Sequence, residues 1–243
     1  MIDYCLVIYK NYGLCSLQEI NFKNRFKKED YRLIVIDNTP DDLKIDFKYD
    51  KSVVDKFIPI ESKPTFDGVS HGHAINEGLK YCETDIVSII DSDFFLLNNN
   101  IHSYIHSKFN QGYQAVGCEY NDGTDASKRW RDINPKNFEH IPCCFGAYYS
   151  RELAMTDSWI ITNEEVQSNM ASGFVEVGYR IRKYILEHKI KTSAWRTTMS
   201  KPCFFKDHDD VVMGMHYVGG SHVRSSQQGL HEIFELITRD IYV

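Results

Sequence analysis

Two carboxylates separated by a single serine form the most chemically suggestive pattern in the sequence. Asp91 and Asp93 directly follow residues 86–90, a mainly branched apolar run that is typical of a buried strand. Carboxylate oxygens are preferred ligands of Mg²⁺ and Mn²⁺, and burying two of them without a compensating charge is costly. Aspartate is also common where a strand gives way to a turn. The pair alone therefore indicates either a divalent-cation site or a solvated turn.

Apolar runs earlier in the chain predict the sheet that would position this pair. Strands are expected at residues 4–9, 32–36 and 53–60, before the strand that ends at Asp91. Two helices alternate with them. The spacing of Ser16 and Glu19 resembles a capping box and predicts a helix that ends near Phe26, and a later helix has Ser70 as its N-cap. Alternation of strands and helices specifies a mostly parallel sheet.

Polar groups follow three of these strands at the same expected edge. Ligands of open parallel sheets bind outside the carboxyl ends of the strands. The groups that fall there are Lys10 with Asn11, Asp37 with Asn38, and Asp91 with Asp93. Their convergence favours the cation site over the solvated turn, although Asp37, within Asp-Asn-Thr-Pro, is also good turn chemistry.

The second half of the sequence is less regular. Its apolar patterns predict strands at 113–120, 143–149 and 211–217, and helices at 101–109, from near Glu176 to 185, and at 230–241. The polar segment 121–137 is expected to lie over the site as a surface loop, and 163–173 is predicted to be a second flexible polar segment. No repeat or linker divides the chain, which predicts one domain over residues 1–243.

Composition excludes several classes of protein. The net charge of −6 disfavours a nucleic-acid binder. No apolar run approaches the roughly 18 residues of a membrane span, and Asp3 stands where a signal peptide carries positive charge, so a cytoplasmic protein without an integral membrane segment is expected. The seven cysteines show no C-x-x-C spacing and are expected to be packed thiols. A homo-oligomer is compatible with the sequence.

Five motifs, in this order, resemble the GT-A-fold glycosyltransferases of the family 2 type. They are Val35-Ile36-Asp37-Asn38, Asn76-Glu77-Gly78-Leu79-Lys80, the D-x-D motif Ile89-Ile90-Asp91-Ser92-Asp93, Phe145-Gly146-Ala147-Tyr148-Tyr149-Ser150-Arg151 and Phe174-Val175-Glu176-Val177-Gly178. The resemblance implies an α/β fold, with a mostly parallel, Rossmann-like central sheet flanked by helices and a smaller mixed second sheet. It also implies a nucleotide-sugar-binding half, 1–98, and an acceptor-binding half, 99–243.

The same resemblance implies transfer of a sugar from a nucleotide-diphosphate donor to a hydroxyl acceptor such as a glycan, with Mn²⁺ or Mg²⁺ as cofactor. Asp93 would bind the metal directly, and Asp91 would bind the metal through water or contact the donor ribose. A late histidine, His216 or His222, would complete metal or diphosphate binding. The other donor-binding residues implied are Tyr9, Asn11, Asp37 and Asn76.

Two positions depart from the family pattern. Glu176 stands where the family carries its acidic motif and would be the general base of an inverting enzyme, but Val175 replaces the first acidic residue of the usual pair. Inversion or retention therefore stays open. Ile75 stands where an arginine is common, and His71, His73 or Lys63 would have to supply the missing positive group.

Other functions are compatible with parts of this pattern. A sugar nucleotidyltransferase would need a glycine-rich basic loop after the first strand, of which residues 10–13 are a poor version. A degenerate, non-catalytic nucleotide-sugar-binding protein is compatible with the altered motif at Glu176. A phosphatase with a D-x-D nucleophile expects threonine where Phe95 stands, which excludes that class.

Overall fold

Ten strands in the described part of the chain form one sheet with helices on both faces. The structure, a computed structural model, describes residues 1–61, 67–119, 140–143, 145–160, 177–197, 202–217 and 227–238. The strands are β1 Ile2–Ile8, β2 Tyr31–Asp37, β3 Val54–Pro59, β4 Ile86–Asp91, β5 Phe94–Leu96, β6 Ala115–Cys118, β7 Gly146–Ser150, β8 Thr192–Thr197, β9 Cys203–Lys206 and β10 Val212–His216. The α-helices are α1 Tyr12–Arg25, α2 Asp67–Leu79, α3 Ile101–Asn110, α5 Arg151–Ala154, α7 Tyr179–Glu187 and α9 Gln227–Thr238.

The first part of the sheet is parallel, as the sequence predicts. Strands β3, β2, β1 and β4 are neighbours in that order, and each pair is parallel. Their registers match at the carboxyl ends, because Ile8 pairs with Asp37 and Val7 pairs with Asp91. Asp37 and Asp91 therefore end their strands at nearly the same level of one edge, on either side of β1.

The remainder of the sheet is antiparallel except for one pair. The order continues β7, β6, β8, β9, β10 and β5, and only β6 and β8 are parallel. Across all ten strands the antiparallel pairs outnumber the parallel ones. The smaller sheet expected from the sequence is the antiparallel end β8–β9–β10–β5, which continues the main sheet.

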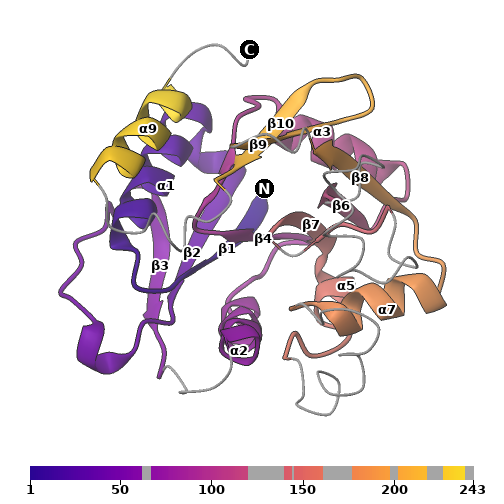
Figure 1. Ribbon diagram of the computed structural model, residues 1–243. Coiled ribbons are helices and arrows are strands. Elements are labelled where there is room, and N and C mark those ends of the chain that lie inside the picture. The colour runs from indigo at the N-terminus through magenta and orange to yellow at the C-terminus, as the bar shows by residue number, and fades with distance from the viewer. Residues whose placement is uncertain are drawn as a thin grey trace.

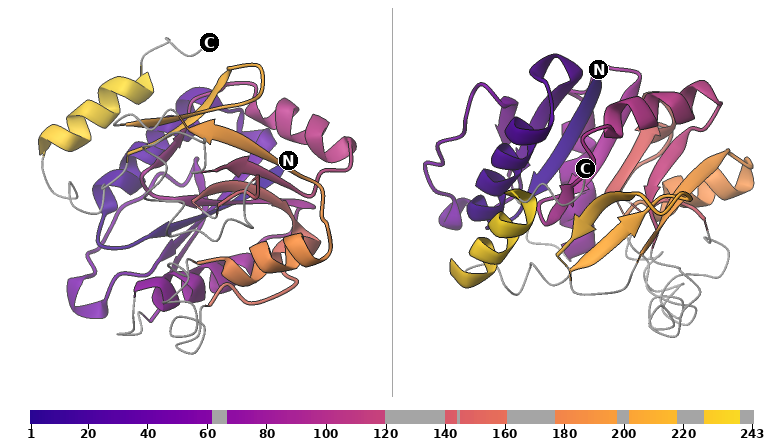
Figure 2. Two further views of the ribbon diagram at one scale, coloured as in Figure 1. Left: turned by 45° about the vertical axis from the view of Figure 1, so that its right-hand side comes forward. Right: turned by 90° about the horizontal axis from the view of Figure 1, so that it is seen from above.

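Helices cover the two faces of the sheet in separate groups (Figure 1). Cys15 and Phe22 of α1 pack in the same core as Ile101 and Ile105 of α3. The core of the opposite face is built from α2, α5 and α7 together with β-strand side chains. In Figure 2, α9 lies along α1, where a third cluster joins the two helices to β5 and β10. The strand that follows the D-x-D motif is thus packed against the α1–α9 pair.

Two helix caps differ from the sequence prediction. Helix α1 begins at Tyr12, and its cap is Asn11, whose Oδ1 accepts a hydrogen bond from the Leu14 N–H at 3.1 Å; the capping-box prediction at Ser16 is wrong. Asn11 has the same capping chemistry one turn earlier and directly follows the strand. Ser70 lies inside α2 and exchanges hydrogen bonds with the Asn38 amide, so it is not the N-cap.

Helix α7 begins later than its apolar spacing suggests. Gly178 precedes Tyr179 as the N-cap and has φ of +80°, a left-handed conformation that glycine adopts without strain.

The six described cysteines are buried and free, as predicted, and burial raises the pKa of the Cys5 and Cys118 thiols well above the ordinary value. Within the described residues, no helix has the length and hydropathy that crossing a membrane requires.

Candidate metal site

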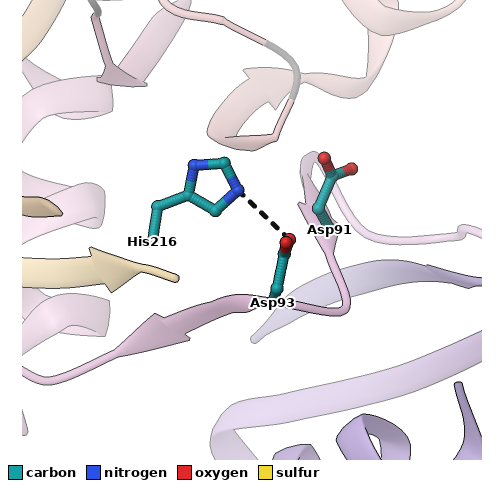
Figure 3. Close-up of side chains that lie close together, drawn as sticks. All are labelled: Asp91, Asp93 and His216. Carbon is teal, nitrogen blue, oxygen red and sulfur yellow. Dashed lines mark hydrogen bonds and ion pairs between the residues drawn. The ribbon is translucent and has the colours of Figure 1, made fainter. Parts of the chain in front are cut away.

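Asp91, Asp93 and His216 come together at the carboxyl edge of the parallel strands (Figure 3). One ligand atom from each residue lies within 4.8 Å of the others, and His216 Nε2 is 3.1 Å from Asp93 Oδ1. The side chains of Asp91, Asp93 and His216 are 28%, 17% and 10% exposed, so the cluster is mostly covered but not sealed from solvent. Two carboxylates and an imidazole thus converge on one partly open space.

Pairing between β5 and β10 is what brings the distant histidine to the aspartates. His216 is the register partner of Phe94, the residue that follows Asp93. The Tyr217 N–H donates to the Asp93 carbonyl oxygen at 2.9 Å and extends this pairing to the turn. Packing then orients the imidazole, because its ring stacks on Phe145 with centroids 4.8 Å apart and an interplanar angle of 15°.

Two glycines allow β5 to sit close to its neighbours. A Cβ at Gly146 would lie 2.8 Å from the ring of Phe94, and one at Gly214 would lie 2.5 Å from the same ring. Neither distance is compatible with a side chain at these positions unless the ring shifts. Phe94 is fully buried between Gly146 of β7 and Gly214 of β10. The packing of its ring positions the Asp91–Asp93 turn that directly precedes it.

Asp91 carries the clearest sign of an incomplete site. Its Oδ1 is buried and accepts no hydrogen bond from the described residues, although His71 Nε2 lies 3.3 Å away at ion-pair distance. Burial raises the pKa of the Asp91 carboxyl; the His71 and His216 imidazoles oppose this shift and the Asp93 carboxylate adds to it. A buried carboxylate oxygen without a donor is disfavoured unless a ligand satisfies it.

The donor set fits a divalent cation. Two carboxylates and one imidazole suit Mn²⁺, which accepts oxygen and nitrogen ligands, and the carboxylates alone also suit Mg²⁺. A cation would satisfy the orphaned Asp91 Oδ1 and offset the repulsion between Asp91 and Asp93. His216, one of the two late histidines named from the sequence, belongs to this cluster. His222 lies outside the described residues.

Asp37 ends β2 at the same edge but is already engaged by the protein. The Tyr12 hydroxyl donates to its Oδ2 at 2.9 Å, and the Thr39 N–H donates to its Oδ1 at 3.0 Å. The Thr39 side chain in turn accepts from the N–H of Lys10, whose φ is +59°. Each Asp37 oxygen keeps lone-pair capacity for a further donor, so its expected role in binding a nucleobase stays a prediction.

The other residues expected to bind the donor are placed in different surroundings. Asn11 is 3% exposed and caps α1, and its Nδ2 has no hydrogen-bond partner in the described part of the chain. The Lys10 ammonium lies over the Tyr9 ring, with Nζ 4.8 Å from the ring centroid. Asn76 uses both amide atoms on the segment after α5: it donates to Ser158 Oγ and accepts from the Trp159 N–H, each at 3.0 Å. Its side chain holds that segment against α2.

The predicted catalytic base, Glu176, lies outside the described residues, which resume at Val177, two positions before α7. The turn that carries Asp91 and Asp93 is also contacted by Gln18, which its sequence pattern did not single out. Gln18 of α1 donates from its amide to the carbonyl oxygens of Ser92 and Phe94. The sequence offered one sign of this contact: Gln18 follows Leu14 by four positions, so the two side chains share the buried face of α1.

Comparison with solved structures finds similar folds among glycosyltransferases. They include a mannosyltransferase from Pyrobaculum calidifontis in complex with GDP-Man and Mn²⁺ (15% identity, 63% of this chain and 45% of that one, TM-score 0.43). TarS from S. aureus is 14% identical over 67% of this chain and 30% of its own, with a TM-score of 0.47. Glucosyl-3-phosphoglycerate synthase from Mycobacterium tuberculosis, in complex with Mn²⁺ and UDP-Glc, is 20% identical over 63% and 57%, with a TM-score of 0.42.

These similarities concern the fold alone. The chain spans between 30% and 57% of the length of these three structures. No family model matches the sequence, and no curated protein matches it. The activity is therefore argued from the side chains of the site.

Proposed function

We propose that this protein is a divalent-metal-dependent glycosyltransferase that moves a sugar from a nucleotide-diphosphate donor to a hydroxyl acceptor. The observation that carries the proposal is the cluster of Asp91, Asp93 and His216 at the carboxyl edge of the parallel strands, where the buried Asp91 Oδ1 accepts no hydrogen bond from the described residues. This edge is where open α/β sheets bind nucleotides. A metal held there would lie beside a diphosphate bound across the strand ends.

The residues divide the work of binding the donor. Asp93, Asp91 and His216 would hold the cation, which neutralises charge gathering on the leaving diphosphate. His71, whose Nε2 lies 3.3 Å from Asp91 Oδ1, would take the phosphate role left open by the absent arginine. On the β2 side, Asp37, Tyr9 and Asn11 would receive the nucleoside, Asp37 as an acceptor of base N–H groups.

The acceptor belongs to the second half of the chain in this proposal. Glu176 would accept the proton of the attacking hydroxyl, as the general base of an inverting transfer. Asn76 would support the site by holding the segment at Ser158 and Trp159 against α2. His222 would add a second imidazole to the metal or diphosphate. A glycan is the acceptor class that we favour.

Calorimetric titration with UDP, GDP and their sugars, in Mn²⁺ and again in EDTA, tests donor binding. We expect one nucleotide to bind in Mn²⁺ and to lose most of its affinity in EDTA, and Asp93→Ala to reproduce that loss. Equal affinity in Mn²⁺ and EDTA would refute the metal-dependent mechanism. Binding without hydrolysis or transfer of the sugar, across a panel of glycan acceptors, would instead favour a non-catalytic binding protein.

Replacement of Glu176 tests the base separately. Glu176→Gln should reduce transfer by roughly 100-fold or more while donor affinity changes little, because a general base acts on the acceptor and contributes about 10²–10⁴-fold to rate. Unchanged turnover would remove Glu176 from the mechanism. The anomeric configuration of the product, read by NMR, would decide between inversion and retention.

A further inference from the structure

Gln18 lies in the interior between α1 and the turn that carries the aspartates. Its side chain is fully buried, beside the apolar cluster to which Leu14 and Leu17 of the same helix belong. Its Nε2 donates to the carbonyl oxygen of Ser92 at 3.0 Å and to that of Phe94 at 2.7 Å. One amide therefore binds both residues that flank Asp93.

The chemistry of these contacts fixes the orientation of the amide. Both partners are carbonyl oxygens, which only accept, so the NH₂ group and not the oxygen must face them. The Oε1 of Gln18 is left buried without a hydrogen-bond partner in the described part of the chain. Leucine would fill similar space and would carry no unsatisfied oxygen of its own, but it would remove the donor to the Ser92 and Phe94 carbonyl oxygens. The polar side chain is explained by what its two hydrogen bonds hold.

Three successive carbonyl groups of the turn are bound from two sides. Gln18 binds those of Ser92 and Phe94 from α1, and the Tyr217 N–H binds that of Asp93 from the end of β10. With these carbonyls fixed, the backbone at Asp93 has little freedom to rotate. The Asp93 carboxylate is thereby held toward His216 Nε2, 3.1 Å away.

We propose that Gln18 is a positioning residue for the metal site: it holds the Asp91–Asp93 turn so that both carboxylates face one cation, without touching that cation. The inference rests on the proposed function, of which it names a supporting part. Residues that orient metal ligands typically change metal affinity by roughly 10- to 100-fold when replaced. Gln18 reaches the ligands through backbone carbonyls, so its effect is expected near the lower end of that range.

The test uses the affinity of the full-length chain for Mn²⁺ alone, measured by EPR titration of free Mn²⁺. Gln18→Met keeps the length and flexibility of the side chain and removes its N–H donors, and Gln18→Leu provides a second apolar variant. Ser88→Ala is the matched control: Ser88 is fully buried in β4 and donates to the Ala147 carbonyl oxygen at 3.2 Å, away from the turn. Thermal unfolding in EDTA records the stability of each protein.

We expect both Gln18 variants to bind Mn²⁺ about 10-fold more weakly than the wild type. Ser88→Ala should bind within about twofold of it, whatever its stability. A Gln18→Met protein that is folded and binds Mn²⁺ within twofold of the wild type would overturn the proposal. If Gln18→Leu fails to fold, Gln18→Met decides.

Hydrogen exchange separates this inference from the proposed function. In EDTA, amide exchange in residues 91–97 should be faster in Gln18→Met than in Ser88→Ala, because the turn loses its attachment to α1. Equal exchange in the two variants would overturn the positioning role. A wild-type protein that binds neither Mn²⁺ nor a nucleotide would refute the proposed function, while the exchange measurement would still decide whether Gln18 holds the turn.

Discussion

Asp37 and the Asp91–Asp93 pair are both aspartates at the end of a buried strand, but their carboxylates have different hydrogen-bonding surroundings. Both follow buried parallel strands, and both lie at the same edge, on either side of β1. The Asp37 carboxylate accepts from the Thr39 N–H, in the turn that follows β2, and from the Tyr12 hydroxyl, at the start of α1. Asp91 Oδ1 is buried and accepts no hydrogen bond within the described part of the chain, and Asp93 contacts His216, 123 positions later in the sequence. Strand-end aspartates at one edge of a sheet thus differ in how far the surrounding protein already satisfies their carboxylates.

Metal binding should separate the two positions most strongly. Asp93→Asn removes a charged ligand and should weaken Mn²⁺ binding by on the order of 100-fold. Asp37→Asn should leave the affinity for Mn²⁺ alone within about twofold, because its carboxylate is held by Tyr12 and Thr39. EPR titration of both variants measures the difference. Similar losses in the two would show that the edge acts as one electrostatic unit.

Stability should respond in the opposite order. Asp37→Ala removes the carboxylate that accepts from the Tyr12 hydroxyl and from the buried Thr39 N–H, and should lower the free energy of unfolding by about 2 kcal/mol. Asp91→Asn, measured in EDTA, removes one of two repelling carboxylates and should raise stability by up to about 1 kcal/mol. Urea unfolding gives both values. Destabilisation by Asp91→Asn as large as that by Asp37→Ala would remove the distinction.

The pH dependence of unfolding should sharpen the contrast. A raised pKa for Asp91 means that the folded protein binds a proton more readily than the unfolded chain does. Stability contributed by this group is then greatest at low pH and is lost as the pH rises from the ordinary carboxyl pKa of about 3.9 through the raised one. In EDTA, the stability of wild type relative to Asp91→Asn should fall over that window. A constant difference would contradict the assigned direction.

The smallest expected effect concerns the Tyr12 hydroxyl alone. Tyr12→Phe removes one hydrogen bond to Asp37 and leaves the Thr39 N–H in place, so it should lower the free energy of unfolding by about 1 kcal/mol. Urea unfolding provides the measurement. A loss as large as that of Asp37→Ala would show that Tyr12, rather than the carboxylate, organises the turn.

Local sequence patterns predicted the part of the fold that is made of local signals. Continuous apolar runs located β1, β2 and β4, and the apolar spacing located α3. The pattern failed where a strand is short or mixed in polarity: β5 has three residues, and β8 includes Thr192, Ser193 and Arg196. Pairing with neighbours stabilises such strands, and neighbours distant in sequence leave no local signature.

The site divides in the same way. Residue type and strand position sufficed to propose the D-x-D pair, and the family resemblance proposed a late histidine. His216 lies beside the aspartates because β10 pairs with β5, a strand that the sequence did not reveal. Gln18 was missed because a single amide in a helix has no distinctive spacing, and only the position of the turn beneath it gives that amide a function.

The separation of Asp93 and His216 by 123 positions also has a consequence for biosynthesis. At about 5–20 residues per second, the aspartates leave the ribosome roughly 6–25 seconds before the histidine does. During that interval β5 lacks β10, its neighbour in the sheet order. The nascent chain can complete the parallel strands early, but the turn gains its last support only after residues 212–216 emerge. The three side chains of the proposed cation site can thus come together only late in synthesis, after most of the sheet can already form.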